Sequence, residues 1–223
     1  MKNKANIIFF GAPGAGKGTQ AKKVSSELKI PHLDTGNLIR EAITGGTGLG
    51  KKAKEYVEGG NLVPDDLVIG LIREKLLELK GNDFKGFILD GFPRTIPQAE
   101  ALGNMMKELN LQITKVLNVQ VPENILIERL SARRLCSNKS CGAIYNMLTK
   151  KTKHEGKCDL CGSDLYQRKD DTTEAAQQRL NEYHNKTAPI ENYYRKQTVL
   201  ADVDCTKDPQ AVYNKILEII SPN

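Results

Sequence analysis

The sequence lacks any apolar run long enough to cross a membrane, and it has no internal repeat or low-complexity tract. A transmembrane helix needs about 18 consecutive apolar residues. The N-terminal run ANIIFF is much shorter, and it ends in a glycine loop where a signal peptide would have a small-residue cleavage site. We therefore expect a cytoplasmic protein with no membrane partner. Its 223 residues, 39% of them hydrophobic, suit one globular domain with small insertions.

Arginine is also scarce, because only nine of the 33 basic residues are arginines. The lysines are scattered and are expected to cover solvated faces, although the net charge is +6. Six of the arginines fall within or beside the motifs described below, at positions 40, 94, 129, 133, 168 and 179. A guanidinium group grips phosphate with two donors, so this distribution is what a phosphate-binding enzyme would show. The alternative, that any one of these arginines forms an ordinary surface ion pair, stays open.

Short apolar segments alternate with helical ones, which predicts an α/β fold with a parallel sheet. Strands are expected at 5–10, 32–34, 86–90, 115–121 and 199–203. Helices are expected at 17–28, 37–44, 49–57, 65–79, 96–109, 123–134 and 209–220. A further long helix is expected to start with a capping box at Asp171–Glu174 and to be split by Pro189. Residues 135–167 hold four cysteines and no helical pattern, which indicates a small domain inserted into one loop.

The first chemical motif is GAPGAGKGT, which follows the first expected strand and opens the first expected helix. It fits the phosphate-loop pattern G-x-x-x-x-G-K-[ST] up to Lys17, but Gly18 displaces the hydroxyl to Thr19. The glycines let backbone N–H groups approach a phosphate, and the helix start adds a partial positive charge. The alternative is a plain glycine turn. The spelling GKGT is similar to that of nucleoside monophosphate kinases.

The second motif is FILDGFPRTIPQAE, at residues 87–100. Asp90 ends a buried strand, where a carboxylate beside a phosphate loop is suited to hold Mg²⁺ through water. The turn after it presents Arg94 at the carboxyl edge of the sheet, where ligands of open α/β sheets bind. The alternative is a simple strand–turn–helix connection with Arg94 in solvent.

Together with these two motifs, DTGNLIR, NLVPDDLV, the doublet Arg133-Arg134 and LYQRKDD make the chain resemble the adenylate kinase family from residue 5 to its end. The resemblance implies a P-loop NTPase-type parallel sheet flanked by helices, with two insertions. These are a helical NMP-binding insertion at 34–63 and a zinc-ribbon-like lid at 132–171, with the core at 1–33, 64–131 and 172–223. It also implies Mg²⁺-dependent conversion of ATP plus AMP to two ADP by a monomer.

The family assigns site residues that the motifs alone do not. By similarity, the ATP side comprises Gly14, Ala15, Gly16, Lys17, Gly18, Thr19, Arg129, Arg133, Ile144, Tyr145 and Lys207. The AMP side comprises Thr35, Arg40, Asn61, Leu62, Val63, Gly91, Phe92, Pro93, Arg94, Gln98, Arg168 and Arg179. Within that set Thr35 and Gln98 read the base, whereas Arg40 and Arg94 grip the α-phosphate. The residues expected to act in catalysis are Lys17, Asp90, Arg94, Arg133, Arg168 and Arg179.

Two expectations concern the donor side and closure. Arg129 is expected to lie against the ATP adenine, and the backbone at Lys207 to approach it. Arg133 is expected to reach the ATP phosphates from the same helix face as Arg129, since the two are four residues apart. Arg168 and Arg179 are expected to lie between the nucleotides. Closure of both insertions would exclude water from the transferred group.

Four cysteines form two close pairs, CSNKSC and CDLC, each followed by glycine. This pattern predicts a structural Zn²⁺ site with ligands Cys136, Cys141, Cys158 and Cys161. Disulfides, free thiols, or His154 in place of one cysteine are the alternatives. The first pair has four intervening residues, whereas metal-binding lids of this family usually have two. Cys205 is expected to have no role.

Other functions remain open from the sequence. A different nucleoside monophosphate kinase would use GTP as donor, or UMP or CMP as acceptor. A zinc ribbon, a phosphate loop and a pI near 9.0 would also suit an ATP-driven nucleic-acid-binding protein. The ribbon has only Tyr145 and Tyr166 as aromatics, which make a poor stacking platform, so we expect no nucleic-acid partner.

Overall fold

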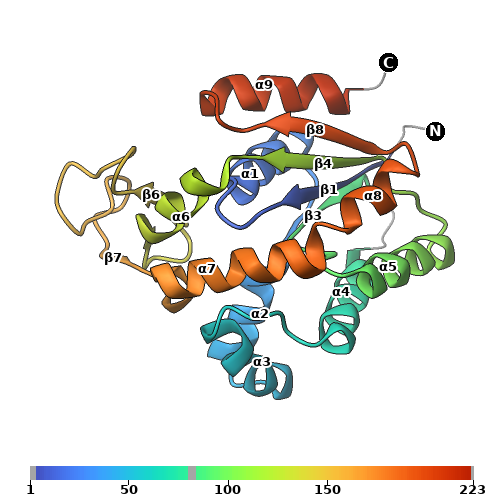
Figure 1. Cartoon of the computed structure of the whole chain (residues 1–223), viewed down its shortest axis with the longest axis horizontal. Coiled ribbons are helices and arrows are strands. Elements are labelled where there is room, and N and C mark those ends of the chain that lie inside the picture. Colours follow the sequence, from blue (N-terminus) through green and yellow to red (C-terminus); the bar gives the residue numbers. More distant parts are fainter. Residues whose placement is uncertain (1–3, 80–83, 222–223) are drawn as a thin grey trace.

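The computed structural model describes residues 4–79 and 84–221, and its centre is a parallel sheet. In these residues the strands lie in the order β2-β3-β1-β4-β8 (Figure 1). Their bounds are Ala5–Gly11 for β1, His32–Asp34 for β2, Gly86–Asp90 for β3, Lys115–Gln120 for β4 and Leu200–Asp204 for β8. All neighbouring pairs are parallel, so every strand delivers its carboxyl end to the same edge of the sheet. The α/β prediction is confirmed.

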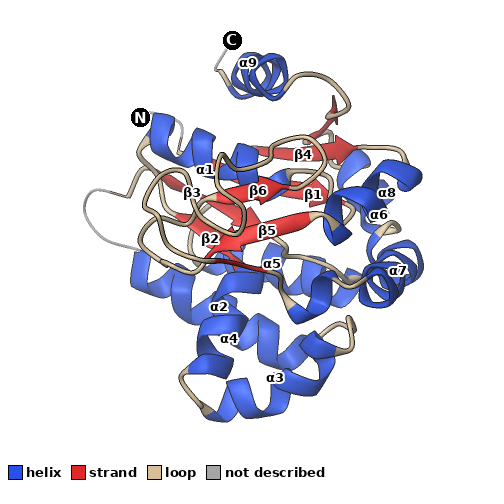
Figure 2. Ribbon diagram, turned by 90° about the vertical axis from the view of Figure 1, so that its left-hand side faces the viewer, coloured by secondary structure: helices blue, strands red, loops and turns tan. Residues whose placement is uncertain are grey.

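Helices cover both faces of this sheet (Figure 2), and the strands are therefore buried on both sides. One face packs against α1 (Lys17–Leu28) and α9 (Pro209–Ile220), with Val24 and Ile216 in the buried cluster. The other packs against α4 (Asp65–Leu79), α5 (Ile96–Glu108) and α8 (Ile190–Arg195). None of the described helices is both long enough and apolar enough to pass through a membrane.

Two short helices, α2 (Thr35–Thr44) and α3 (Gly48–Glu58), are inserted between β2 and α4. Asp34 caps α2 by accepting from the Asn37 backbone N–H at 2.9 Å, and Thr47 caps α3. The two helices meet at Gly50, where an added Cβ would lie 2.0 Å from the Ala42 carbonyl oxygen. Glycine therefore permits the close crossing that makes this pair a compact flap, as Figure 1 shows below the sheet.

The second insertion is a small antiparallel sheet in the order β6-β5-β7. Its strands are β5 (Arg133–Cys136), β6 (Ile144–Asn146) and β7 (Leu165–Tyr166). The expected helix at 123–134 is wrong at its end, because α6 (Glu123–Ser131) stops before Arg133. Arg133 lies in β5 and pairs with Asn146 of β6. Strand pairing in the lid therefore overrides the helical periodicity of the sequence.

The long helix after the lid also differs in detail. Thr172 is the N-cap of α7 (Thr173–Glu182) and accepts from the Ala175 backbone N–H, so the capping box predicted at Asp171 is wrong. Asp171 instead ends the short 3-10 helix η1 (Lys169–Asp171) and uses its carboxylate elsewhere. The expected split near Pro189 is confirmed, since the π-helical segment η2 (Tyr183–Thr187) separates α7 from α8.

Candidate active site at the carboxyl edge of the sheet

The phosphate-loop segment connects β1 to α1 with the geometry that an anion site requires. Gly11, Gly14 and Gly16 all have positive φ angles, of 135°, 84° and 95°. A Cβ on Gly14 would lie 3.0 Å from the Leu126 carbonyl oxygen, so the loop lies close against α6. No side chain caps the start of α1, which leaves its first N–H groups available to a bound phosphate.

Lys17 stands at the start of α1 and turns back over this loop. Its ammonium group donates to the Gly11 and Ala12 carbonyl oxygens at 2.9 Å each. Burial in the cleft lowers the pKa of Lys17 to about 8; Asp90 opposes that shift, while Arg94, Arg179 and Arg133 add to it. A bound polyphosphate would offset both the burial and the repulsion among these cations.

The extra glycine of GKGT has a structural reason. Gly18 faces the end of β3, where an added Cβ would lie 3.2 Å from Oδ2 of Asp90. Asp90 is only 7% exposed, and the same oxygen lies 3.4 Å from Nε2 of His32. The glycine therefore lets a nearly buried carboxylate lie close to the phosphate loop.

The turn after β3 places Arg94 as the sequence predicts. The Phe92–Pro93 peptide bond is cis, and Nε of Arg94 donates to the Gly91 carbonyl oxygen at 2.8 Å. The carbonyl of Arg94 accepts from the Thr187 hydroxyl at 2.8 Å, which ties the turn to η2. Burial lowers the pKa of Arg94, while nearby Asp90 opposes that shift. The guanidinium group is thus held in one direction, and no carboxylate forms an ion pair with it in the part of the chain that the structure describes.

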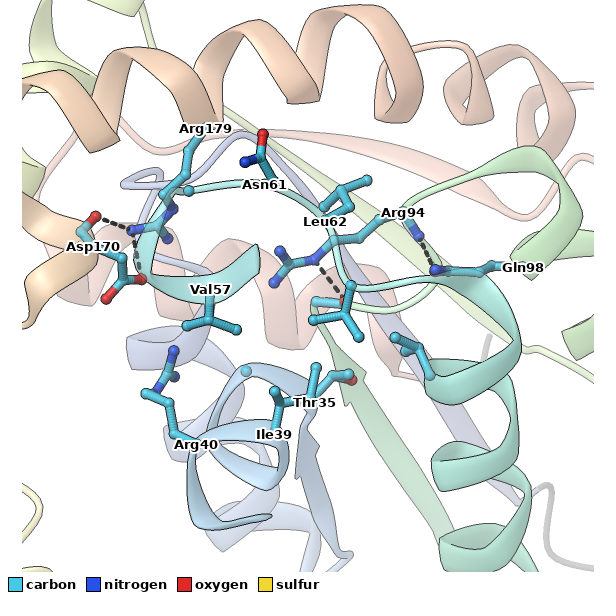
Figure 3. A pocket seen from close by; sticks show the side chains of 15 residues that line it. Thr35, Ile39, Arg40, Val57, Asn61, Leu62, Arg94, Gln98, Asp170 and Arg179 are labelled. Atoms are coloured by element: carbon cyan, nitrogen blue, oxygen red, sulfur yellow. Dashed lines mark hydrogen bonds and ion pairs between the residues drawn. The ribbon is translucent and has the colours of Figure 1, made fainter. Parts of the chain in front are cut away.

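A pocket lies between the flap and this turn (Figure 3). Its volume is about 580 Å³ when the open space at its mouth is included. Its wall contains most of the residues predicted for the AMP side: Thr35, Arg40, Asn61, Leu62, Val63, Gly91, Arg94, Gln98 and Arg179. The Thr35 hydroxyl is buried without a hydrogen-bond partner among the described residues, which suits a polar ligand group.

A second pocket lies on the phosphate-loop side and contains Lys17 and Gly11 in its wall. The two pockets share Arg94 and Arg179, together with Gly60, Leu62 and Gly91. The shared residues form a boundary at which groups bound in either pocket would meet. Sequence reasoning missed Tyr183, Glu182 and Thr187 in the second wall, because no motif distinguishes them within their helical segment.

Two acids hold Arg179 of this boundary and Arg133 beside it. The carboxylate of Asp171, which is fully buried, accepts from both Arg133 and Arg179. Arg179 also donates to the Asp170 carbonyl oxygen at 3.0 Å, and its side chain lies 3.2 Å from the Asp170 carboxylate. Burial lowers the pKa of Arg179 to about 10 even though Asp170 opposes the shift. Neither acid was predicted as a site residue, although the letters KDD lie directly after Arg168.

The flap is held against the C-terminal end of the lid segment, at Arg168 and Lys169. Oδ1 of Asn37 accepts from Arg40 at 2.7 Å and from Arg168 at 3.2 Å. Lys169 pairs with Glu58 at 2.9 Å across the same boundary. Burial lowers the pKa of Arg40 to about 10, and the neighbouring Arg168 adds to that shift. The arrangement concentrates positive charge over the first pocket.

Of the residues expected on the ATP side, only Lys17 lies in the wall of either pocket, as the described residues define them. Arg129 donates to the Cys205 carbonyl oxygen at 3.2 Å, near the end of β8, whereas Lys207 and Ile144 are exposed. Arg133 lies on β5 and not on the helix of Arg129, so the expected shared helix face is wrong. Tyr145 is 3% exposed and its hydroxyl accepts from the Asp159 backbone N–H at 2.9 Å, so its side chain faces the interior of the lid.

The four lid cysteines converge as predicted from their spacing. Their sulfur atoms all lie within 4.8 Å of one another, with Cys136–Cys161 at 3.4 Å and Cys141–Cys158 at 3.7 Å. Four thiolates about 2.3 Å from one tetrahedral zinc ion would be about 3.8 Å apart, so the donor set fits zinc. The thiols are free, which argues against the disulfide alternative. His154 is not part of this group among the described residues.

Comparison with known proteins agrees with this geometry. The family model for adenylate kinase matches residues 9–199. An adenylate kinase of Archaeoglobus fulgidus is 52% identical, over 96% of this chain and 97% of its own length. One from Thermodesulfovibrio yellowstonii is 47% identical, over 96% of this chain and 98% of its own length. One from Caldicellulosiruptor saccharolyticus is 50% identical, over 87% of this chain and 88% of its own length. With most of its length matched at this level of identity, the chain belongs to the adenylate kinase family.

Proposed function

We propose that this protein catalyses the reversible, Mg²⁺-dependent transfer of the terminal phosphoryl group from ATP to AMP, giving two ADP. The observation that carries the proposal is the pair of adjoining pockets with Arg94 and Arg179 in their common wall. An AMP phosphate oxygen would attack the γ-phosphorus there, while the bond to the departing ADP oxygen breaks. Phosphoryl transfer depends on positioning and on cations that spread the developing charge, and this boundary supplies both.

The acceptor would occupy the first pocket. The Thr35 hydroxyl, which has no hydrogen-bond partner among the described residues, and the Gln98 amide would bind its base. Arg40 and Arg94 project into the same space from the flap and from the turn after β3, as Figure 3 shows, and would bind its phosphate. The remaining predicted AMP-side residues that line the pocket would hold the sugar and close the flap: Asn61, Leu62, Val63 and Gly91. Phe92 and Pro93 would shape the turn that presents Arg94, and Arg168 would meet the acceptor's phosphate beside Arg40.

The donor would lie over the phosphate loop. Backbone N–H groups from Gly14 to Thr19 would hold its phosphates, with Lys17 as the principal cation. Arg133 would reach the same phosphates from β5, since Asp171 already fixes its guanidinium group near Arg179. The adenine would lie between Arg129, Ile144 and the backbone at Lys207. We exclude the Tyr145 side chain from this contact because the lid interior encloses it.

Two metal ions belong to the proposal. Asp90 would hold Mg²⁺ through water beside the donor phosphates, where the ion supplies charge neutralisation. The four lid cysteines would hold Zn²⁺ in a structural role, because they fill all four tetrahedral positions. The proposed domain boundaries are 1–33, 34–63, 64–131, 132–171 and 172–223. We also propose that the protein acts as a monomer in the cytoplasm and that it binds nucleotides but no nucleic acid or membrane.

Dependence on AMP is the experiment that tests the reaction. Purified protein mixed with Mg·ATP is expected to form ADP only when AMP is added, because water is a poor substitute for the bound acceptor. ADP formation would be followed with AMP, UMP or CMP as acceptor and with ATP or GTP as donor. RNA and DNA are added separately as controls, and they are expected to change nothing. Hydrolysis that needs no AMP, or that nucleic acid stimulates, would refute the proposal.

The pH dependence of the free enzyme is expected to report Lys17. Its pKa of about 8 means that the ammonium loses its proton as the pH rises through that value, so kcat/KM for Mg·ATP falls above pH 8. Bound phosphates favour the charged form, so kcat at saturating ATP is expected to fall only at higher pH. The internal control is kcat/KM for AMP at saturating ATP, which would lack the inflection near 8. An identical profile for both substrates would contradict the assignment.

A further inference from the structure

Asp65 links the starts of two helices next to the first pocket. It is the first residue of α4, and its Oδ2 accepts from the Thr95 hydroxyl at 2.8 Å, at the N-cap of α5. Its Oδ1 accepts from Nε2 of Gln98 at 2.7 Å. Gln98 lines the pocket, whereas Asp65 is absent from the pocket wall as the described residues define it. Asp65 therefore contacts the pocket only through its neighbours.

The Gln98 amide is held in one orientation from both of its ends. The Arg94 backbone N–H donates to Oε1 at 2.8 Å, and the Asp65 carboxylate accepts from Nε2. A backbone N–H requires the oxygen and a carboxylate requires the NH₂ group, so an amide flip would break both contacts. Gln98 is 2% exposed, so water does not compensate for a flip. One N–H and one oxygen lone pair of this amide are left for a ligand.

A fixed amide distinguishes bases by the order of their donors and acceptors. Adenine offers its N6–H donor beside a ring-nitrogen acceptor, and a glutamine amide can meet both at once. Hypoxanthine offers an O6 acceptor beside an N1–H donor, so the same amide would face it with like groups opposed. We propose that Asp65 is a positioning residue that sets the base specificity of the acceptor site by fixing the orientation of Gln98. The inference rests on the proposed function.

The simpler role for Asp65 is to fasten α4 to α5. That role would change stability, and it would affect all acceptors equally. Specificity is therefore the informative measurement. It is expressed as kcat/KM for AMP divided by kcat/KM for inosine 5′-monophosphate (IMP). These two nucleotides differ only at the edge of the base. Thermal midpoints are recorded beside it to measure the structural contribution.

Three variants test the inference at saturating Mg·ATP. Asp65→Ala is expected to lower the AMP-to-IMP ratio about tenfold, mainly through a higher KM for AMP with kcat within about twofold. Asp65→Asn retains an acceptor oxygen without its charge, so a fall of about threefold is expected. Asp66→Ala removes the adjacent, exposed acid from the same first turn of α4 and is the matched control, with the ratio unchanged.

An unchanged ratio in Asp65→Ala, or a change that Asp66→Ala reproduces, overturns the inference. Should the alanine variant not fold, the asparagine variant decides, because it preserves the side-chain volume. Failure of the proposed function looks different: the unaltered protein would then form no ADP from Mg·ATP and AMP. An unaltered protein that uses AMP and IMP equally well would also overturn the inference, since there would be no specificity for Asp65 to set.

Discussion

Arg179→Met is expected to lower kcat for ADP formation by about 10³-fold, with a much smaller change in KM for either nucleotide. Arg179 lies in the wall of both pockets, where the transferred group would carry its developing charge. Losing one such cation removes an interaction made mainly in the transition state, which is worth about 10³-fold or more in related phosphoryl transfers. Steady-state kinetics with both substrates varied would separate kcat from KM.

The same substitution is expected to lower stability, and this must be measured separately. Asp171 would keep Arg133 as a partner, but Asp170 would lose its ion pair with Arg179, and leaving a buried acid unpaired costs about 3 kcal/mol. Rates are therefore compared well below the thermal midpoint of the variant. Arg195→Met is the matched control, because that arginine forms surface ion pairs with Glu191 and Asp202, away from both pockets. A variant that raises KM without lowering kcat would show that Arg179 only binds a nucleotide.

Cys136→Ser is expected to reduce bound zinc from one ion per chain to nearly none. The lid has only a small buried cluster around Cys136, Tyr145 and Cys158, so the metal would supply much of its folding energy. Because β5 carries both Cys136 and Arg133, loss of the lid would also displace Arg133 from the donor phosphates. We expect kcat/KM for ATP to fall by about 10²-fold and the thermal midpoint to fall. Elemental analysis would measure the bound zinc, steady-state kinetics would measure kcat/KM, and calorimetry would measure the thermal midpoint.

Cys205→Ser is the control for this prediction. Cys205 is buried after β8, outside the lid, and burial raises the pKa of its thiol to about 11. It is absent from the group of converging sulfurs that the structure describes. Its substitution is therefore expected to leave the metal content unchanged. Full zinc content in Cys136→Ser, or equal losses in both variants, would contradict the four-cysteine site.

Parts of the site could be predicted from the sequence because their spacing is local. The phosphate loop occupies consecutive residues, and Gly11 to Lys17 fold as that pattern predicts. The turn that presents Arg94 follows a strand whose buried character is evident from GFILD. The cysteine pairs likewise predict a metal site from two short segments. Neighbouring residues impose the geometry of the loop and of the turn, whereas each cysteine pair supplies two nearby ligands and the lid fold brings the two pairs together.

Other parts of the site depend on contacts between distant segments. For these parts the sequence led either to a wrong prediction or to no prediction. Arg133 fits a helical pattern, yet it lies in a strand because Asn146 pairs with it. The hydroxyl of Tyr145 accepts from the Asp159 backbone N–H inside the lid, a contact that the sequence did not indicate. Asp171 resembles a helix cap, yet it accepts from two arginines. No local pattern encodes which partner such a residue meets.

The sequence alone determined the fold class, the phosphate loop, the metal-binding pattern and the likeness to the adenylate kinase family. Each of these follows from short-range spacing and from the order of strands and helices. Only the tertiary structure decided that the two pockets share Arg94 and Arg179, and that Asp65 fixes the Gln98 amide. Such contacts join residues that lie 33 or more positions apart, and their geometry is set by how the helices pack on the sheet.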